Sequence, residues 1–191
     1  MTNGKAGVAP NVDRDPILAA YRLWNENGWE DCAAGCTAVT SLMRVHQVLT
    51  QQADRVLAPI DLTFARYELL VRLYFHKGAL PLNQLGRQLQ IHQTSITSLV
   101  DRLEKQGLIK RTPHPSDRRS TIAQMTPAGR VLTRNAIKLL NSELFRKLGL
   151  SDREAHLLIG LLMKMRRSWN DIENPEGWEQ FEVGLDSLSA D

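Results

Sequence analysis

The sequence is poor in cysteine and has no long apolar run. Cys32 and Cys36 are its only two cysteines in 191 residues, too few for a disulfide framework. None of its apolar runs approaches the roughly 20 residues that cross a bilayer. The opening residues, MTNGKAGVAP, also lack the apolar core of a secretory signal. We therefore expect an intracellular, cytoplasmic protein with no membrane partner.

Catalytic and metal-binding motifs are missing as well. The sequence contains no nucleophile elbow, phosphate-binding loop or paired-carboxylate arrangement. Its histidines have no ligand-like spacing and no tight cluster with cysteine; they are His46, His76, His92, His114 and His156. These absences argue against an enzyme, a metal site or a bound cofactor.

Positive charge is concentrated in one region of the chain. The net charge is only +3, yet residues 82–134 contain nine Lys or Arg and three Asp or Glu. Residues 1–36 and 135–191 are each net acidic. A local basic field is what phosphate binding needs, although a solvated helix face can have the same composition. The apolar pattern must therefore decide between these interpretations.

Most of the chain has the apolar spacing of amphipathic helices. We predict helices over residues 15–28, 37–57, 64–75, 126–148 and 151–169, and a short terminal helix around Trp178, Phe181 and Leu185. Thr126-Pro127 supplies a cap and a first-turn proline, and Ser151 with Glu154 supplies a capping box. The helices near both ends have broad apolar faces without a globular body of their own, which favours an intertwined dimer.

The central region, residues 82–125, has a different pattern. Two short helices are followed by a β-hairpin, and Ala79-Leu80-Pro81 is short enough to be its third strand. The predicted fold is mainly α with a small β-hairpin wing (α+β), a winged helix-turn-helix flanked by dimerisation helices. We divide the chain into a disordered N-terminus (1–12), N-terminal dimerisation helices (13–61), a DNA-binding domain (62–125) and C-terminal dimerisation helices (126–191).

The second short helix of this region predicts contact with DNA bases. Ile96, Leu99, Val100 and Leu103 recur at helical spacing and should pack inward. Small hydroxyls and an amide at the start of the other face suit a major groove, where glutamine can pair with adenine. The candidate DNA-binding residues on this helix are Gln93, Thr94, Ser95, Thr97, Ser98 and Arg102.

The hairpin predicts a basic wing. Gly107 should end the helix, and the strands on either side of PHPSDRR should pair. Arg118 and Arg119 lie in this loop and could sense the width and potential of a minor groove. Asp117 cannot favour DNA itself, so we expect it to pair with an arginine that holds the loop.

The motif GLIKRTPHPSDRRS, followed by the helix start TPAG, resembles the wing of the MarR (multiple-antibiotic-resistance regulator) family. The family's Asp-any-Arg motif falls on Asp117 and Arg119, and the resemblance extends from about Thr37 to Trp169. It implies an obligate homodimer that binds a pseudo-palindromic, double-stranded operator through two recognition helices and two wings. Such regulators are usually repressors released by a small molecule, often an aromatic acid.

The chain departs from the family pattern in two places. His92 stands where the family often has a serine cap, and histidine is a poorer cap. The N-terminal helix resembles the extension of members that sense urate or coenzyme A thioesters of phenolic acids. The resemblance implies a ligand pocket between the dimer helices and the winged unit. Its candidate ligand-binding residues, with His76, are Trp24, Arg44, His46, Arg66, Tyr67 and Tyr74.

Three alternatives stay open at the level of sequence. Cys32 and Cys36 could sense hydroperoxides, as in some family members, but no positive charge near them would stabilise a thiolate. The protein could also be a non-specific architectural DNA binder, or a winged helix used only for protein contacts. The polar outer face of the second short helix argues against the last alternative, because protein interfaces usually offer aromatic or apolar anchors.

Overall fold

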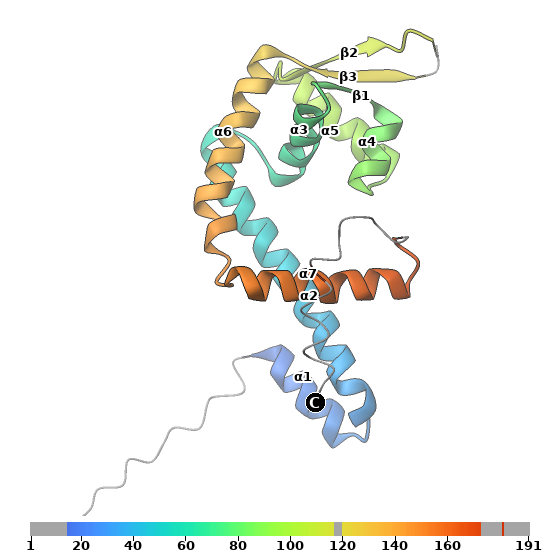
Figure 1. The fold of residues 1–191 in the computed structure, drawn as a ribbon, viewed down its shortest axis with the longest axis vertical. Coiled ribbons are helices and arrows are strands. Elements are labelled where there is room, and N and C mark those ends of the chain that lie inside the picture. The colour runs from blue at the N-terminus through green and yellow to red at the C-terminus, as the bar shows by residue number, and fades with distance from the viewer. Residues whose placement is uncertain (1–14, 117–119, 173–180, 182–191) are drawn as a thin grey trace, which may run out of the picture. The chain divides into compact units, whose positions relative to one another are not determined.

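The computed structural model describes residues 15–116, 120–172 and 181. The chain divides into two compact units, Met1–Leu140 and Asn141–Asp191. Within the described residues, no helix is long and apolar enough to span a membrane. The fold is mainly helical with one small antiparallel sheet, as the sequence predicts (Figure 1).

The first unit begins with two helices, α1 (Pro16–Glu26) and α2 (Glu30–Leu57), which pack against each other (Figure 1). Asp15 caps α1 by accepting a hydrogen bond from the N–H of Ile17 at 2.9 Å. The predicted start of α2 at residue 37 is wrong, because the helix begins seven residues earlier. Glu30 and Asp31 lie in its first turn, where acidic side chains interact favourably with the helix dipole.

The helix-turn-helix follows a short 3-10 turn (Ala58–Ile60) and consists of α3 (Phe64–Phe75), α4 (Leu82–Leu89) and α5 (Gln93–Lys105). Thr63 caps α3 through its side chain. Asp54, on α2, also accepts the N–H of Phe64 at 2.6 Å, which ties the end of α2 to the start of α3. Leu69, Leu70 and Leu73 of α3 are fully buried in the core that α3, α4 and α5 share.

Three strands complete the winged unit: β1 (Ala79–Pro81), β2 (Ile109–Pro113) and β3 (Thr121–Met125). Their order is β1-β3-β2, so β3 is central and β2 lies at an edge. In the β2–β3 hairpin, Arg111 is opposite Ala123. The bridging strand predicted at residues 79–81 is therefore confirmed, and it pairs with β3.

The helix α6 (Pro127–Glu143) leaves the sheet, and the second unit contains the 3-10 turn Phe145–Lys147 and α7 (Asp152–Ser168). The predicted end of α6 at residue 148 is wrong, because the chain changes to the 3-10 turn after Glu143. The predicted capping box at the start of α7 is present: Ser151 and Glu154 exchange side-chain and backbone hydrogen bonds. Of the predicted terminal helix, Trp178 and Leu185 lie outside the described residues.

Candidate nucleic-acid interface

The helix α5 has one buried face and one polar, exposed face. Ile96, Val100 and Leu103 are completely buried, which fixes the rotation of the helix in the core. The polar side chains predicted to meet DNA are exposed; they are Thr94, Ser95, Thr97, Ser98 and Arg102. Gln93 starts the helix, and its side chain falls outside the described part of the structure. The interior packing of α5 therefore presents its hydroxyl-rich edge to solvent.

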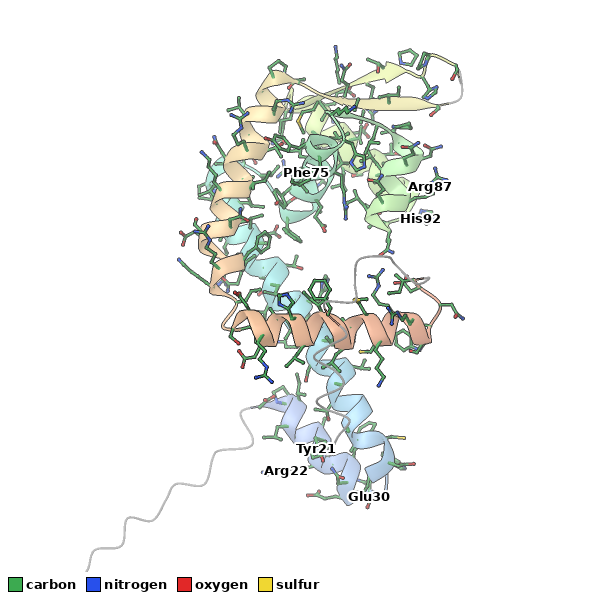
Figure 2. The ribbon with its side chains drawn as sticks, in the orientation of Figure 1. Tyr21, Arg22, Glu30, Phe75, Arg87 and His92 are labelled. Atoms are coloured by element: carbon green, nitrogen blue, oxygen red, sulfur yellow. The ribbon has the colours of Figure 1, made fainter. Side chains whose placement is uncertain are left out.

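His92 occupies the cap position of α5, between α4 and α5 (Figure 2). Its side chain makes no capping hydrogen bond to the backbone and instead lies 3.1 Å from the hydroxyl of Thr94, measured from Nδ1 to Oγ1. The backbone carbonyl of His92 accepts the N–H groups of Ser95 and Ile96. The imidazole is thus exposed at the positive end of the helix dipole, where an anion is favoured.

A cluster of one arginine and two carboxylates joins α5 to the base of the wing. Arg111, on β2, donates from Nη1 to Glu104 Oε2 at 2.6 Å and from Nη2 to Asp101 Oδ1 at 2.5 Å. Burial favours a lower pKa for Arg111, but the hydrogen bonds and charges of Asp101 and Glu104 outweigh it and raise that pKa. Helical spacing places Asp101 opposite the buried face of α5, but it does not predict a contact with Arg111. The alternation of β2 was the signal that could have placed Arg111 over α5.

The C-terminal end of α5 is held by a second polar cluster. Gln106 donates to the carbonyl and the carboxylate of Asp61, at 3.1 Å and 2.8 Å, and accepts Arg66 Nη1 at 2.8 Å. Asp61 lies just after the end of α2, and Arg66 lies on α3. The end of α5 is therefore bonded directly to the α2–α3 junction.

The start of α6 is fitted closely against the turn that precedes the wing. The Thr126 hydroxyl donates to the carbonyl of Gly107 at 2.8 Å and accepts the N–H of Gly129 at 3.0 Å. A Cβ at Gly129 would lie 2.0 Å from the carbonyl oxygen of Leu108. Only glycine, which has no Cβ, allows this approach. The TPAG motif therefore needs glycine at its last position, Gly129.

The tip of the wing, Asp117, Arg118 and Arg119, lies outside the described residues. The predicted pairing of Asp117 with an arginine and the two predicted arginine contacts therefore stay predictions. In the described part of the loop, the N–H of Ser116 donates to His114 Nδ1 at 3.4 Å.

The candidate ligand residues lie in two regions of the first unit. Trp24 is half-buried on α1 and meets Trp29 edge to face, with ring centroids 5.3 Å apart. Figure 2 shows Tyr21 and Arg22 on the same helix and Glu30 at the start of α2. Arg44 lines a hollow of about 230 Å³ with Asp15, Ile17, Met43 and other residues of α1 and α2. His46, also on α2, is exposed.

The other candidates are on α3, and their partners come from α3, the C-terminal end of α5, and α6. Tyr67 is buried and stacks on Phe64, with ring centroids 5.8 Å apart. Burial and the charge of Glu68 raise the pKa of Tyr67, so it stays a neutral phenol. Arg130 lies over the ring of Tyr74 at 5.4 Å from its centroid. Arg66 belongs to the cluster around Gln106 described above.

His76 closes the list of candidates, at the C-cap of α3. Its Nδ1 is 2.9 Å from the carbonyl of Arg72, and its Nε2 is 3.3 Å from Gln88 Nε2. Phe75, which precedes His76 in the sequence, is labelled in Figure 2, as is Arg87 on α4. The structure thus gives His76 contacts that join α3 to α4.

Cys32 and Cys36 lie in the first turns of α2, and both are free thiols. The negative charge of Asp31, with a hydrogen bond to it, raises the pKa of the exposed Cys32. A raised pKa leaves less thiolate at neutral pH, which slows oxidation by peroxide. Among the described residues, no group of three or more His, Cys, Asp or Glu side chains is placed to hold a metal ion.

Comparison with known proteins agrees with this geometry. The sequence model of the MarR family matches residues 62–121. The chain is 28% identical over 157 residues to YdgJ, an uncharacterized HTH-type transcriptional regulator of Bacillus subtilis (strain 168), covering 79% of this chain and 92% of the relative.

Solved structures extend the similarity to three dimensions. Sco5413, a MarR family transcriptional regulator from Streptomyces coelicolor, is 35% identical with a TM-score of 0.67, covering 74% of this chain and 99% of that one. A mutant of MarR from E. coli, complexed with operator DNA, is 25% identical with a TM-score of 0.58, covering 67% and 95%. The chain therefore belongs to the MarR family and is a winged-helix, DNA-binding transcriptional regulator rather than an enzyme.

Proposed function

We propose that the protein is a homodimeric repressor that binds a pseudo-palindromic operator and leaves it when a small aromatic ligand binds. The observation that carries the DNA-binding part is the two-faced helix α5. Its inner face is locked in the core by Ile96, Val100 and Leu103, and its outer face exposes hydroxyl side chains. Such a face suits close approach to base edges in the major groove. Arg118 and Arg119 are the proposed minor-groove contacts.

The operator partner is supported by the E. coli MarR mutant, whose structure was determined with operator DNA. In this chain, the excess of basic residues in 82–134 supplies the charge needed to neutralise phosphates. Two copies of α5 would then contact two half-sites, which is why we propose a pseudo-palindrome.

The proposed dimer uses residues 13–61 and 126–191. Large apolar side chains are exposed along α2 of the first unit; they are Val39, Met43, Val45, Val48 and Leu49. In the second unit, Leu158, Leu161 and Trp169 are also exposed. Surfaces of this kind usually mark an interface rather than a face that stays in water. Sedimentation of the purified protein at micromolar concentration should give twice the mass of the chain, and a monomer would contradict the proposal.

The proposed effector is a phenolic acid, its coenzyme A thioester, or urate. Two separate features of α1 and α2 support it: the aromatic pair Trp24–Trp29, and the hollow lined by Arg44, to whose lining neither tryptophan contributes. Aromatic walls with one cation suit a planar anion, because arginine binds carboxylates with two parallel hydrogen bonds.

The DNA-binding proposal is tested with duplexes that the wild-type protein selects from a randomised library. Arg119→Ala should weaken binding and flatten the dependence of log Kd on log salt by about one unit. The control is Arg146→Ala, which removes one exposed charge outside the winged unit and should leave the slope unchanged. Ser95→Ala should reduce discrimination between sequences more than non-specific affinity. If unselected DNA competes equally well with the selected duplex, the protein is an architectural binder instead.

The effector is tested by gel shift of the same complex with phenolic acids, their coenzyme A thioesters, urate and cumene hydroperoxide. Release by one of the aromatic compounds, weakened in Trp24→Ala or Arg44→Ala, supports the proposal. Release by the hydroperoxide that disappears in Cys32→Ser would assign redox sensing instead.

A further inference from the structure

Arg111 brings together two carboxylates of the recognition helix at the base of the wing. Its side chain is 28% exposed, and those of Asp101 and Glu104 are 48% and 37% exposed. Each carboxylate takes a different nitrogen of the guanidinium, so arginine bridges the two acids in a fixed planar geometry that the single nitrogen of lysine does not reproduce. A third, longer contact at 3.5 Å joins Nη2 to the backbone carbonyl of Thr97. The guanidinium thus meets α5 over two turns.

Glu104 also fixes the backbone of the wing. Its Oε1 accepts the backbone N–H of Arg111 at 2.9 Å, while its Oε2 accepts Nη1 of the same residue. Because β2 is an edge strand, this N–H faces away from β3 and would otherwise have no partner in the sheet. One carboxylate on α5 therefore holds both the main chain and the side chain of a residue on β2.

The two carboxylates have an electrostatic consequence for DNA binding. Asp101 follows the exposed hydroxyl face of α5 by one turn, and unneutralised acids there would repel phosphates. Arg111 neutralises one of their two charges and draws both of them towards β2. A simple charge count predicts that removing the carboxylates would strengthen DNA binding. If the carboxylates instead hold the wing in position, removing them should weaken DNA binding.

We propose that Arg111, Asp101 and Glu104 form a clamp that sets the position of the wing relative to the recognition helix. Arg111 is a positioning residue in this proposal: it acts through the two carboxylates of α5 and not by contacting DNA. The clamp lies on the strand that leads into the loop containing Arg118 and Arg119, so a loosened base would misplace the wing while α5 stays in its core. This inference rests on the proposed function, because it requires a bound operator that is contacted by both α5 and the wing.

The test compares three variants of the full chain on the duplex that the wild-type protein selects. Arg111→Met removes the half of the clamp that lies on β2. The double variant Asp101→Asn, Glu104→Gln removes the charges of the half that lies on α5. Each should weaken binding by about tenfold, which is one decade in Kd. Arg111→Lys keeps the charge but must bring both acids to a single nitrogen, and it should recover only part of the affinity. The matched control is Glu143→Gln, which breaks the exposed Lys147–Glu143 pair, also 2.6 Å long. Because Glu143 lies in the segment proposed to form the dimer, sedimentation first checks that this variant keeps the wild-type mass, and its affinity should then equal that of the wild type.

Hydroxyl-radical footprinting separates positioning from general stability. In the Arg111→Met complex, protection of the flanks that the wings reach should be lost, while protection of the central half-sites remains. Circular dichroism melting of each variant identifies any that does not fold; if Arg111→Met is unfolded, the double variant carries the test.

Stronger binding by the double variant would overturn the clamp, because the two acids would then act only as repelling charges. Wild-type affinity and an unchanged footprint in Arg111→Met would also overturn it. Equal loss of protection across the whole site would show a general stabilising role and overturn it too. If the wild-type protein selects no sequence at all, the proposed function itself fails, and the inference fails with it.

Discussion

Replacing Gly129 with alanine tests the close approach between α6 and the turn before β2. Alanine favours a helix interior by about 1 kcal/mol over glycine, so propensity alone predicts a more stable protein. The new Cβ, however, would lie 2.0 Å from the carbonyl oxygen of Leu108 and 3.2 Å from Cγ of Met125. The first obstacle is backbone, which cannot rotate away as a flexible side chain can.

The expected loss follows from the bonds that this carbonyl makes. It accepts the Thr126 N–H at 3.0 Å and its hydroxyl at 3.1 Å, so moving it disturbs the cap of α6. Overpacking costs about 1–3 kcal/mol, and a weakened cap costs about 1 kcal/mol. After subtracting the propensity gain of about 1 kcal/mol, Gly129→Ala should lose about 1–3 kcal/mol of unfolding free energy. For a chain of this length, about 2 kcal/mol corresponds to a fall in Tm of roughly 4–8 °C.

Gly35→Ala is the matched control for this prediction. Gly35 is also helical, within α2, and a Cβ there would meet no atom within 4 Å. It should therefore show only the gain in propensity, up to about 1 kcal/mol. Both variants would be melted by circular dichroism at one protein concentration, since association shifts apparent stability. If Gly129→Ala were as stable as Gly35→Ala, the proposed clash with the Leu108 carbonyl would be refuted.

Three further predictions follow from single contacts. Asp54→Ala removes the acceptor of the first N–H of α3 and should cost about 1 kcal/mol in urea unfolding, whereas Asp54→Asn, which keeps an acceptor, should cost less; equal losses would contradict this. Asp31→Asn should speed alkylation of Cys32 by iodoacetamide at neutral pH, in a chain whose other cysteine is serine, because Asp31 raises the pKa of that thiol; an unchanged rate would rule out this cause. The Ser151 hydrogen bonds lower the pKa of Glu154, so the stability that they add is present above the ordinary glutamate pKa and is lost as pH falls through the lowered value. The difference in unfolding free energy between wild type and Ser151→Ala should therefore shrink in acid, and a difference constant with pH would exclude this linkage.

Elements that depend on neighbouring residues could be predicted from the local pattern of the chain. Ile96, Val100 and Leu103 recur at helical spacing, so the buried face of α5 could be predicted and is confirmed. The Ser151–Glu154 capping box and the Thr126 cap are also confirmed, because each joins groups three residues apart. The start of α2 was harder to predict. Its first residues, EDCAAGC, lack the apolar spacing on which the prediction relied.

The contacts that join these elements link residues far apart in the sequence, so they could not be predicted from local pattern. Arg111 reaches Asp101 across 10 residues, and Gln106 reaches Asp61 across 45. The pattern of α5 shows that Asp101 faces outward, but not that β2 passes beside it. In the sequence, Gly129 likewise has nothing to distinguish it from another helical residue. The structure shows that the Leu108 carbonyl oxygen lies 2.0 Å from where its Cβ would be. Short-range periodicity sets which face of a helix is buried, whereas these contacts depend on which segments the folded core brings together.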